Sequence, residues 1–290
     1  MKKSNKPEEN KGKSIKLNFF DSVNVLLANL PERSREILKK RFGLADGQIE
    51  TLEKIGHDYG ITRERVRQII YDAINKISRF SDTDVFKMAE EKIILEILGN
   101  SGIISEENLI EKLGSDDQME ARSVVFLANC SDKISSTEEK GLIKKSWIVS
   151  KKILADVKIV NELAKLVLDE EKNPLTDAEI AQKIMAKNKD LSKNEILSML
   201  RVLKNISRNK FGKWGRSDWM EINPKGTRER IYLVLKEEKK PLHFREIAKL
   251  IDKSGINKKK SHPQTVHNEL IKDKRFVLIG RGIYALSDWG

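Results

Sequence analysis

The sequence predicts an all-α protein with small β wings, in which a helix-turn-helix domain is followed by three winged-helix repeats. The helical spacing of apolar residues from Phe19 to Ile77, with a helix-turn-helix pattern inside that stretch, predicts the first domain. A motif that returns roughly every 70 residues beyond residue 83 predicts the repeats. We therefore expect a disordered basic tail and four domains, at residues 1–16 for the tail and then 17–80, 84–150, 153–223 and 226–290.

The helix-turn-helix is expected within residues 51–77. Thr51 and Thr62 are residue types that cap helix N-termini, and Gly60 can adopt the left-handed conformation that ends a helix. An apolar stripe in the second helix follows the helical period and should be buried: Val66, Ile69, Ile70, Ala73, Ile74 and Ile77. The other face carries polar side chains: Arg63, Glu64, Arg67, Gln68 and Tyr71.

Each repeat begins with a long amphipathic helix, at 89–98, 157–168 and 228–235. A short capped helix follows, with aligned starts at 104–109, 175–180 and 242–247. A third helix comes next, and a strand-like pair around glycine closes the repeats at 134–149, 211–222 and 276–286. Three helices and a two-stranded wing make a winged helix; three unrelated helical bundles are the alternative.

Composition narrows the class of protein. Hydrophobic residues make up 39% and charged residues 34% of the 290 residues, so most of the surface is solvated helix. The single cysteine excludes an internal disulfide and fits a reducing cytoplasm, where we expect the protein. One cysteine and four histidines leave few ligands for a metal. No apolar run approaches the ~18 residues that a membrane span needs, so no membrane is expected either.

The net charge of +12 is distributed unevenly. Residues 224–290 contain 16 Lys and Arg against 8 Asp and Glu, a net charge of +8. Residues 81–150 contain 8 against 14, a net charge of −6. The basic end can attract a polyanion and the acidic middle would repel one, although excess lysine also serves solubility alone.

No catalytic set is visible. His57 has no second ligand near it, and His262 and His267 are five residues apart, which fits neither same-face helical spacing. The sequence shows no Ser/His/Asp or Cys/His set and no glycine-rich phosphate loop after a strand. We expect no enzyme, no cofactor and no small-molecule substrate.

The second helix of residues 51–77 carries the chemistry for reading DNA. In a helix-turn-helix, the N-terminal residues of this helix meet base edges in the major groove. Arginine pairs with guanine, glutamate accepts from the cytosine amino group, and glutamine pairs with adenine. Arg63, Glu64 and Gln68 supply these three chemistries, and Arg65 is placed to reach a phosphate. An ordinary amphipathic helix with a charged face is the alternative.

Four strings in this domain resemble region four of the primary sigma factors: LPER at 30–33, RFGL at 41–44, TLEKIG at 51–56 and YGITRERVRQI at 59–69. The resemblance covers about residues 26–77. It implies a domain that reads the −35 promoter element of double-stranded DNA and docks on the flap of RNA polymerase. It implies base reading by Arg63, Glu64 and Gln68, and phosphate contact by Thr62, Arg65 and Arg67.

That family opens DNA at the −10 element with an aromatic-rich region upstream of region four. About 25 residues precede Leu26, which is too few for that region. We therefore expect −35-type recognition without a self-sufficient sigma factor.

The last repeat resembles the HARE-HTH family over about residues 226–287. The strings that carry the resemblance are PLHFREIA at 241–248, PQTV at 263–266 and GRGIYAL at 280–286. This winged helix-turn-helix occurs in the delta subunit of RNA polymerase and beside DNA-processing modules, so it implies a role near DNA or polymerase. The cations that we expect to bind phosphate here are Lys258, Lys259, Lys260, Lys274 and Arg281.

The sequence thus predicts sequence-specific binding of double-stranded DNA in transcription initiation or its regulation, with RNA polymerase as a partner. The first alternative is a delta-like interaction protein, which the −6 charge of residues 81–150 favours for the first repeat. The second alternative is a targeting subunit of a DNA-modifying system. Salt-dependent duplex affinity would distinguish the DNA-binding interpretation from polymerase capture alone.

Overall fold

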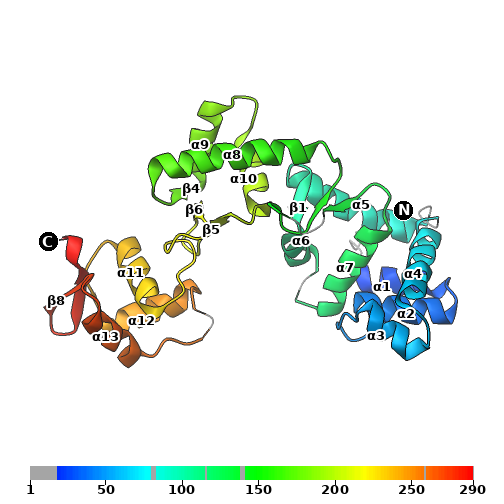
Figure 1. Cartoon of the computed structure of the whole chain (residues 1–290), viewed down its shortest axis with the longest axis horizontal. Coiled ribbons are helices and arrows are strands. Elements are labelled where there is room, and N and C mark those ends of the chain that lie inside the picture. Colours follow the sequence, from blue (N-terminus) through cyan, green and yellow to red (C-terminus); the bar gives the residue numbers. More distant parts are fainter. Residues whose placement is uncertain (1–17, 80–82, 115, 138–140, 258, 290) are drawn as a thin grey trace, which may run out of the picture. The chain divides into compact units, whose positions relative to one another are not determined.

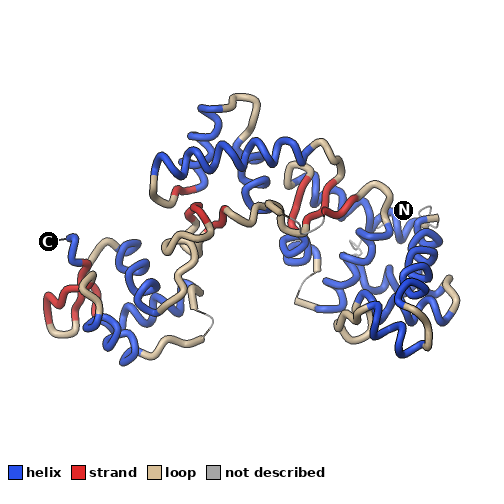
Figure 2. The backbone as a smooth tube through the Cα atoms, viewed as in Figure 1, coloured by secondary structure: helices blue, strands red, loops and turns tan. Residues whose placement is uncertain are grey.

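The computed structural model describes residues 18–79, 83–114, 116–137, 141–257 and 259–289 (Figure 1). The basic tail expected at residues 1–16 lies outside the described residues. Within those ranges the chain is mostly helical, with thirteen α-helices and three small antiparallel sheets (Figure 2). The predicted class, all-α with small β wings, is therefore confirmed.

The fold contains two compact units. Unit one comprises the described residues up to Glu96 together with Glu107–Ser135, and unit two comprises Ile97–Glu106 and the described residues from Ser136 onward. The helix-turn-helix domain lies in unit one, and the second and third repeats lie in unit two.

Four helices form the N-terminal domain: α1 (Phe19–Ala28), α2 (Glu32–Phe42), α3 (Leu52–Tyr59) and α4 (Arg63–Ser78). The hydroxyls of Thr51 and Thr62 cap α3 and α4, and Gly60 ends α3 with a left-handed φ of 63°, as the sequence predicts. In the apolar stripe of α4, Val66, Ala73 and Ile77 are buried. The other three members, Ile69, Ile70 and Ile74, are half-buried because α2 and α3 cover only one side of the helix.

The repeats share one element order: helix, strand, helix, helix, strand, strand. The first contains α5 (Asp84–Gly99), β1 (Ile103–Ser105), α6 (Glu106–Leu113), α7 (Gln118–Cys130), β2 (Ser135–Thr137) and β3 (Ser146–Ile148). The second contains α8 (Ile153–Glu171), β4 (Leu175–Thr176), α9 (Asp177–Lys187), α10 (Lys193–Val202), β5 (Ile206–Arg208) and β6 (Lys213–Arg216). The third contains α11 (Thr227–Glu238), β7 (Leu242–His243), α12 (Phe244–Ser254), α13 (Pro263–Lys272), β8 (Phe276–Gly280) and β9 (Ile283–Leu286), followed by the short helix η1 (Ser287–Trp289). This threefold order confirms the winged-helix prediction.

Each sheet has three strands, one more than the two-stranded wing that the sequence predicts. The orders are β1-β3-β2, β4-β6-β5 and β7-β9-β8, so the strand before the short helix pairs with the last strand of the wing. These extra strands are only two or three residues long and precede the helix directly. Such short strands carry no alternating pattern, which explains why the sequence does not reveal them.

Helix α7, the third helix of the first repeat, packs against the N-terminal domain within unit one. The carboxylate of Glu120 accepts hydrogen bonds from the backbone N–H groups of Phe19 (2.7 Å) and Phe20 (2.8 Å), at the start of α1. The rings of Phe126 and Phe42 meet edge to face at 5.1 Å. The backbone carbonyl of Gly47 accepts from Gln118 (3.1 Å) and Arg122 (3.2 Å). This helix is therefore a scaffold for the domain before it.

The third helix of the second repeat, α10, is also enclosed. Residues 196–200 of α10 are all buried, and the helix contacts β1 within unit two. Ile103 and Ile148 of the first repeat's sheet belong to the same apolar cluster as these residues. The N–H of Lys144 donates to the carbonyl of Val202 at 2.9 Å. In α13, by contrast, only Val266 and Leu270 are buried.

We expect Glu120→Ala to raise the labelling rate of Cys130 by thiol reagents about fivefold. Cys130 is the single cysteine, it is buried, and burial raises the pKa of its thiol, so labelling requires unit one to open. Losing a helix cap costs about 1 kcal/mol, and Asn18 still caps α1. Stopped-flow labelling under native conditions measures the rate.

The matched control is Glu111→Ala, which removes an exposed carboxylate of α6 that has no partner among the described residues. The tryptophans lie at positions 147, 214, 219 and 289, all in unit two, so their fluorescence transition should not move in either variant. An unchanged labelling rate in Glu120→Ala would show that this carboxylate does not stabilise unit one.

Candidate nucleic-acid interface

The first turn of α4 presents the predicted base-reading side chains to solvent. Side chains of Arg63, Glu64 and Arg67 are 67%, 59% and 60% exposed. Thr62 begins the helix because its hydroxyl oxygen accepts the N–H of Arg65 at 3.1 Å. The buried residues of α4 hold the opposite face on the domain core, so this exposed turn is rigidly supported.

These side chains pair with neighbours in the protein. Arg63 lies 2.8 Å from the carboxylate of Glu53 on α3, and Arg65 donates to the side-chain oxygen of Gln68 at 3.3 Å. Arg67 donates twice to Glu64, at 2.7 and 2.9 Å. These hydrogen bonds hold the pKa of the Glu64 carboxyl below its usual range and raise the pKa of Arg67. Exposed pairs of this kind are weak and exchange readily for a ligand.

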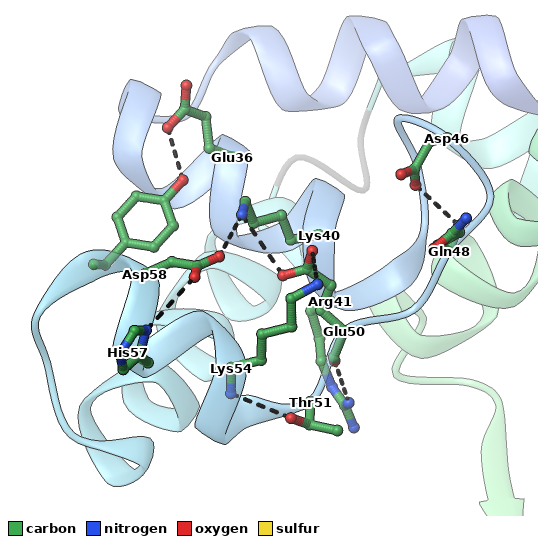
Figure 3. Close-up of polar contacts among 11 residues, drawn as sticks. Glu36, Lys40, Arg41, Asp46, Gln48, Glu50, Thr51, Lys54, His57 and Asp58 are labelled. Atoms are coloured by element: carbon green, nitrogen blue, oxygen red, sulfur yellow. Dashed lines mark hydrogen bonds and ion pairs between the residues drawn. The ribbon is translucent and has the colours of Figure 1, made fainter.

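A polar network fastens α3 to α2 (Figure 3). Lys40 of α2 lies 2.7 Å from Asp58 and 3.6 Å from Glu50, on either side of it in the view. The hydroxyl of Tyr59 donates to Glu36 at 2.8 Å. The hydrogen bond from Lys40 lowers the pKa of Asp58 and raises its own. The first helix of the helix-turn-helix is thus held in place, and with it the start of α4.

The C-terminal cations separate into two sets. Lys259 and Lys260 are exposed immediately before α13, whereas Lys274 and Arg281 flank the two ends of β8. Lys258 lies outside the described residues. The five cations that the sequence groups together therefore do not form one set on one element.

A groove between α12 and the start of α13 adds two cations that the sequence analysis missed. It has a volume of about 620 Å³, and Arg245, Lys249 and Lys260 line it together with Asp252, Ser261 and His262. Arg245 and Lys249 are four residues apart on α12, the spacing that places side chains on one helix face. That spacing was the signal available in the sequence. None of the three lining cations has an ion-pair partner among the described residues.

In the described parts of the chain, no group of three or more His, Cys, Asp or Glu residues could hold a metal ion. His57 is 92% exposed and contacts only Asp58, at 4.0 Å. None of the described helices is both long enough and apolar enough to cross a membrane.

Two family models match parts of the chain. Residues 26–79 match region 4 of sigma-70, and residues 227–289 match HARE-HTH, the helix-turn-helix domain of ASXL proteins and restriction endonucleases. Both resemblances inferred from the sequence are thereby confirmed. The matched domains are DNA-binding helix-turn-helix types with a link to transcription, and neither family is enzymatic.

The similar curated proteins are sigma factors from cyanobacteria. The chain is 37% identical over 81 residues to the RNA polymerase sigma factor SigA of Nostoc sp., an alignment that covers 28% of this chain and 20% of that protein. It is 36% identical over 81 residues to SigA1 of Synechococcus elongatus (28% and 20%) and to SigA of Microcystis aeruginosa (28% and 19%). The chain thus spans about a fifth of the length of the curated relatives that it matches.

Proposed function

We propose that the protein binds double-stranded DNA sequence-specifically in transcription initiation or its regulation, reading a −35-type element together with RNA polymerase. The observation that carries this proposal is the exposed first turn of α4, which presents Arg63, Glu64 and Gln68 in a domain that matches sigma-70 region 4. Arg63 pairs with a guanine, Glu64 accepts from a cytosine amino group, and Gln68 pairs with an adenine.

Phosphate contact falls to Thr62, Arg65 and Arg67. The Thr62 hydroxyl accepts the N–H of Arg65 and keeps its own O–H to donate to a phosphate. The N-terminal end of α4 adds the positive end of the helix dipole at the same place. Docking exchanges the pairs of Arg67 with Glu64 and of Arg65 with Gln68 for contacts to DNA.

A second DNA contact comes from the groove of the C-terminal domain, where Arg245, Lys249, Lys259 and Lys260 neutralise phosphates. The two repeats between these contacts do not read bases through their third helices. Helix α7 packs on the N-terminal domain and α10 is enclosed, so neither is available to enter a groove. They serve as scaffold, which the net charge of −6 in residues 81–150 also favours.

RNA polymerase is the proposed protein partner, through its flap and the region-four-like domain. Helix α7 already covers part of α1 and α4. The polymerase therefore either uses the surface that α7 leaves uncovered or displaces α7 from it.

In vitro selection of bound duplexes tests the proposal, starting from a randomised library, with and without core RNA polymerase. We expect one enriched consensus, the same in both arms and sharper with polymerase, and absent for a double variant Arg63→Ala/Gln68→Ala. A selection in which the wild type enriches no consensus in either arm would overturn sequence-specific binding.

We expect Glu53→Gln to tighten duplex binding about two- to fivefold at low salt. The change frees Arg63 from its ion pair and removes a negative charge beside the phosphates. Fluorescence anisotropy with a labelled duplex measures it. The control is Glu32→Gln at the start of α2, which makes the same change in net charge on an exposed carboxylate outside α3 and α4. Equal gains in both variants would show that Arg63 is not the residue released.

A further inference from the structure

The wing of the last repeat has an exposed apolar edge. Val277, Leu278 and Ile279 of β8 are 43%, 59% and 56% exposed, and Ile271 at the end of α13 is 65% exposed. We call these four residues the apolar wing edge. Strand β8 lies at the edge of its sheet, so one row of its backbone N–H and C=O groups has no strand partner among the described residues. Proteins usually protect such an edge with charges, proline or a covering element.

The other two wings do not share this feature. Their edge strands are β2, with the sequence Ser-Ser-Thr, and β5, with Ile-Ser-Arg. In β5 the isoleucine is buried. The exposed apolar strand is therefore specific to the last repeat and does not follow from the winged-helix architecture.

Cations surround the apolar wing edge. Lys272 and Lys274 precede β8 and Arg281 follows it; all three are exposed and form no ion pair with another described residue. Arg275, by contrast, is neutralised by Asp273 at 2.7 Å and lies over the ring of Tyr232. A strand that pairs with β8 thus meets apolar side chains in its middle and unpaired positive charge at both ends.

This charge pattern discriminates among occupants. If β8 paired antiparallel with β8 of a second copy, Lys274 would stand opposite Arg281 at both ends, and like charges opposite each other destabilise a sheet. For DNA, the apolar wing edge offers three neighbouring side chains that form no hydrogen bond with phosphate. An extended protein segment with apolar residues between acidic ones satisfies the strand edge, the apolar surface and the cations together.

We propose that β8 is a docking edge for an extended segment of a partner protein, which adds as a fourth strand and carries acidic residues on both sides of alternating apolar ones. The proposal does not rest on DNA reading by α4. It assigns Lys274 and Arg281 to a protein contact, and leaves phosphate contact in this domain to the groove of α12 and α13.

The test is selection of random twelve-residue peptides, displayed on phage, against the immobilised full-length chain. We expect enriched peptides with alternating apolar residues between Asp or Glu. Fluorescence anisotropy with the synthetic consensus peptide should show affinity lowered at least about tenfold by Leu278→Thr/Ile279→Thr. These two side chains are exposed and threonine keeps strand propensity, so the variant should remain folded, which its tryptophan fluorescence checks. Leu166→Gln, at a 53% exposed leucine of α8, is the matched control and should leave binding unchanged.

The charge-reversed variant Lys274→Glu/Arg281→Glu gives the sharper arm. Selection on this variant should enrich peptides with Lys or Arg flanks, because the rim has changed sign. The same acidic consensus on both proteins, or no enrichment on the wild type, would overturn the proposal. So would a dimer in sedimentation velocity that Leu278→Thr/Ile279→Thr dissociates, or a fall in duplex affinity in that variant, since these outcomes assign the edge to a second copy or to DNA.

Discussion

Arg63→Ala and Gln68→Ala should each cost about 1–3 kcal/mol of binding to the selected duplex, about 5- to 150-fold in Kd, with little change on random duplex. Both side chains project from the exposed first turns of α4, and neither is part of the domain core. Alanine therefore removes a bidentate contact to a base without changing the fold. Titration of labelled selected and random duplexes by anisotropy measures both affinities.

Arg65→Ala is the matched control. Arg65 lies in the same turn and its proposed contact is a phosphate, so the decrease in affinity should be similar on both duplexes, and the salt dependence should fall by about 0.9. Equal decreases for Arg63→Ala on selected and random duplex would assign Arg63 to phosphate as well.

Local signals made the recognition helix predictable from the sequence. Thr62 caps α4 within its own first turn, Gly60 ends α3 by its own backbone freedom, and the period of Val66, Ala73 and Ile77 marks the buried face. Each of these features depends on residues a few positions apart. The exposed position of Arg63 and Glu64 on the other face follows from the same period.

The features that the sequence did not predict depend on distant residues. The contact of Glu120 with α1 joins positions about 100 apart, and the enclosure of α10 needs the sheet of the preceding repeat. Neither leaves a periodic pattern in its own segment. The pairing of Arg63 with Glu53 spans the turn between two helices, so it depends on how α3 crosses α4. These long-range contacts decide which of the third helices stay available for DNA.

The triple variant Lys249→Ala/Lys259→Ala/Lys260→Ala should flatten the salt dependence of random-duplex binding strongly. The slope of log affinity against log salt falls by about 0.9 for each phosphate that the protein no longer neutralises, hence by about 2.7 for three. These cations lie at the groove of α12 and α13 or in the segment leading into it, without ion-pair partners among the described residues, so they can exchange counterions for phosphates. Anisotropy titrations between about 50 and 200 mM salt measure the slope.

Lys274→Ala/Arg281→Ala is the control that separates local contact from net charge. It removes two cations from the same basic domain, yet both flank β8 rather than the groove. Bulk charge would lower the slope in both variants in proportion to the cations removed, whereas contact at the groove predicts a lower slope only in the triple variant. The preferred sequence should stay the same in all cases, because Arg63, Glu64 and Gln68 are untouched. A slope that falls with Lys274→Ala/Arg281→Ala and not with the triple variant would move the DNA contact of this domain from the groove to its wing.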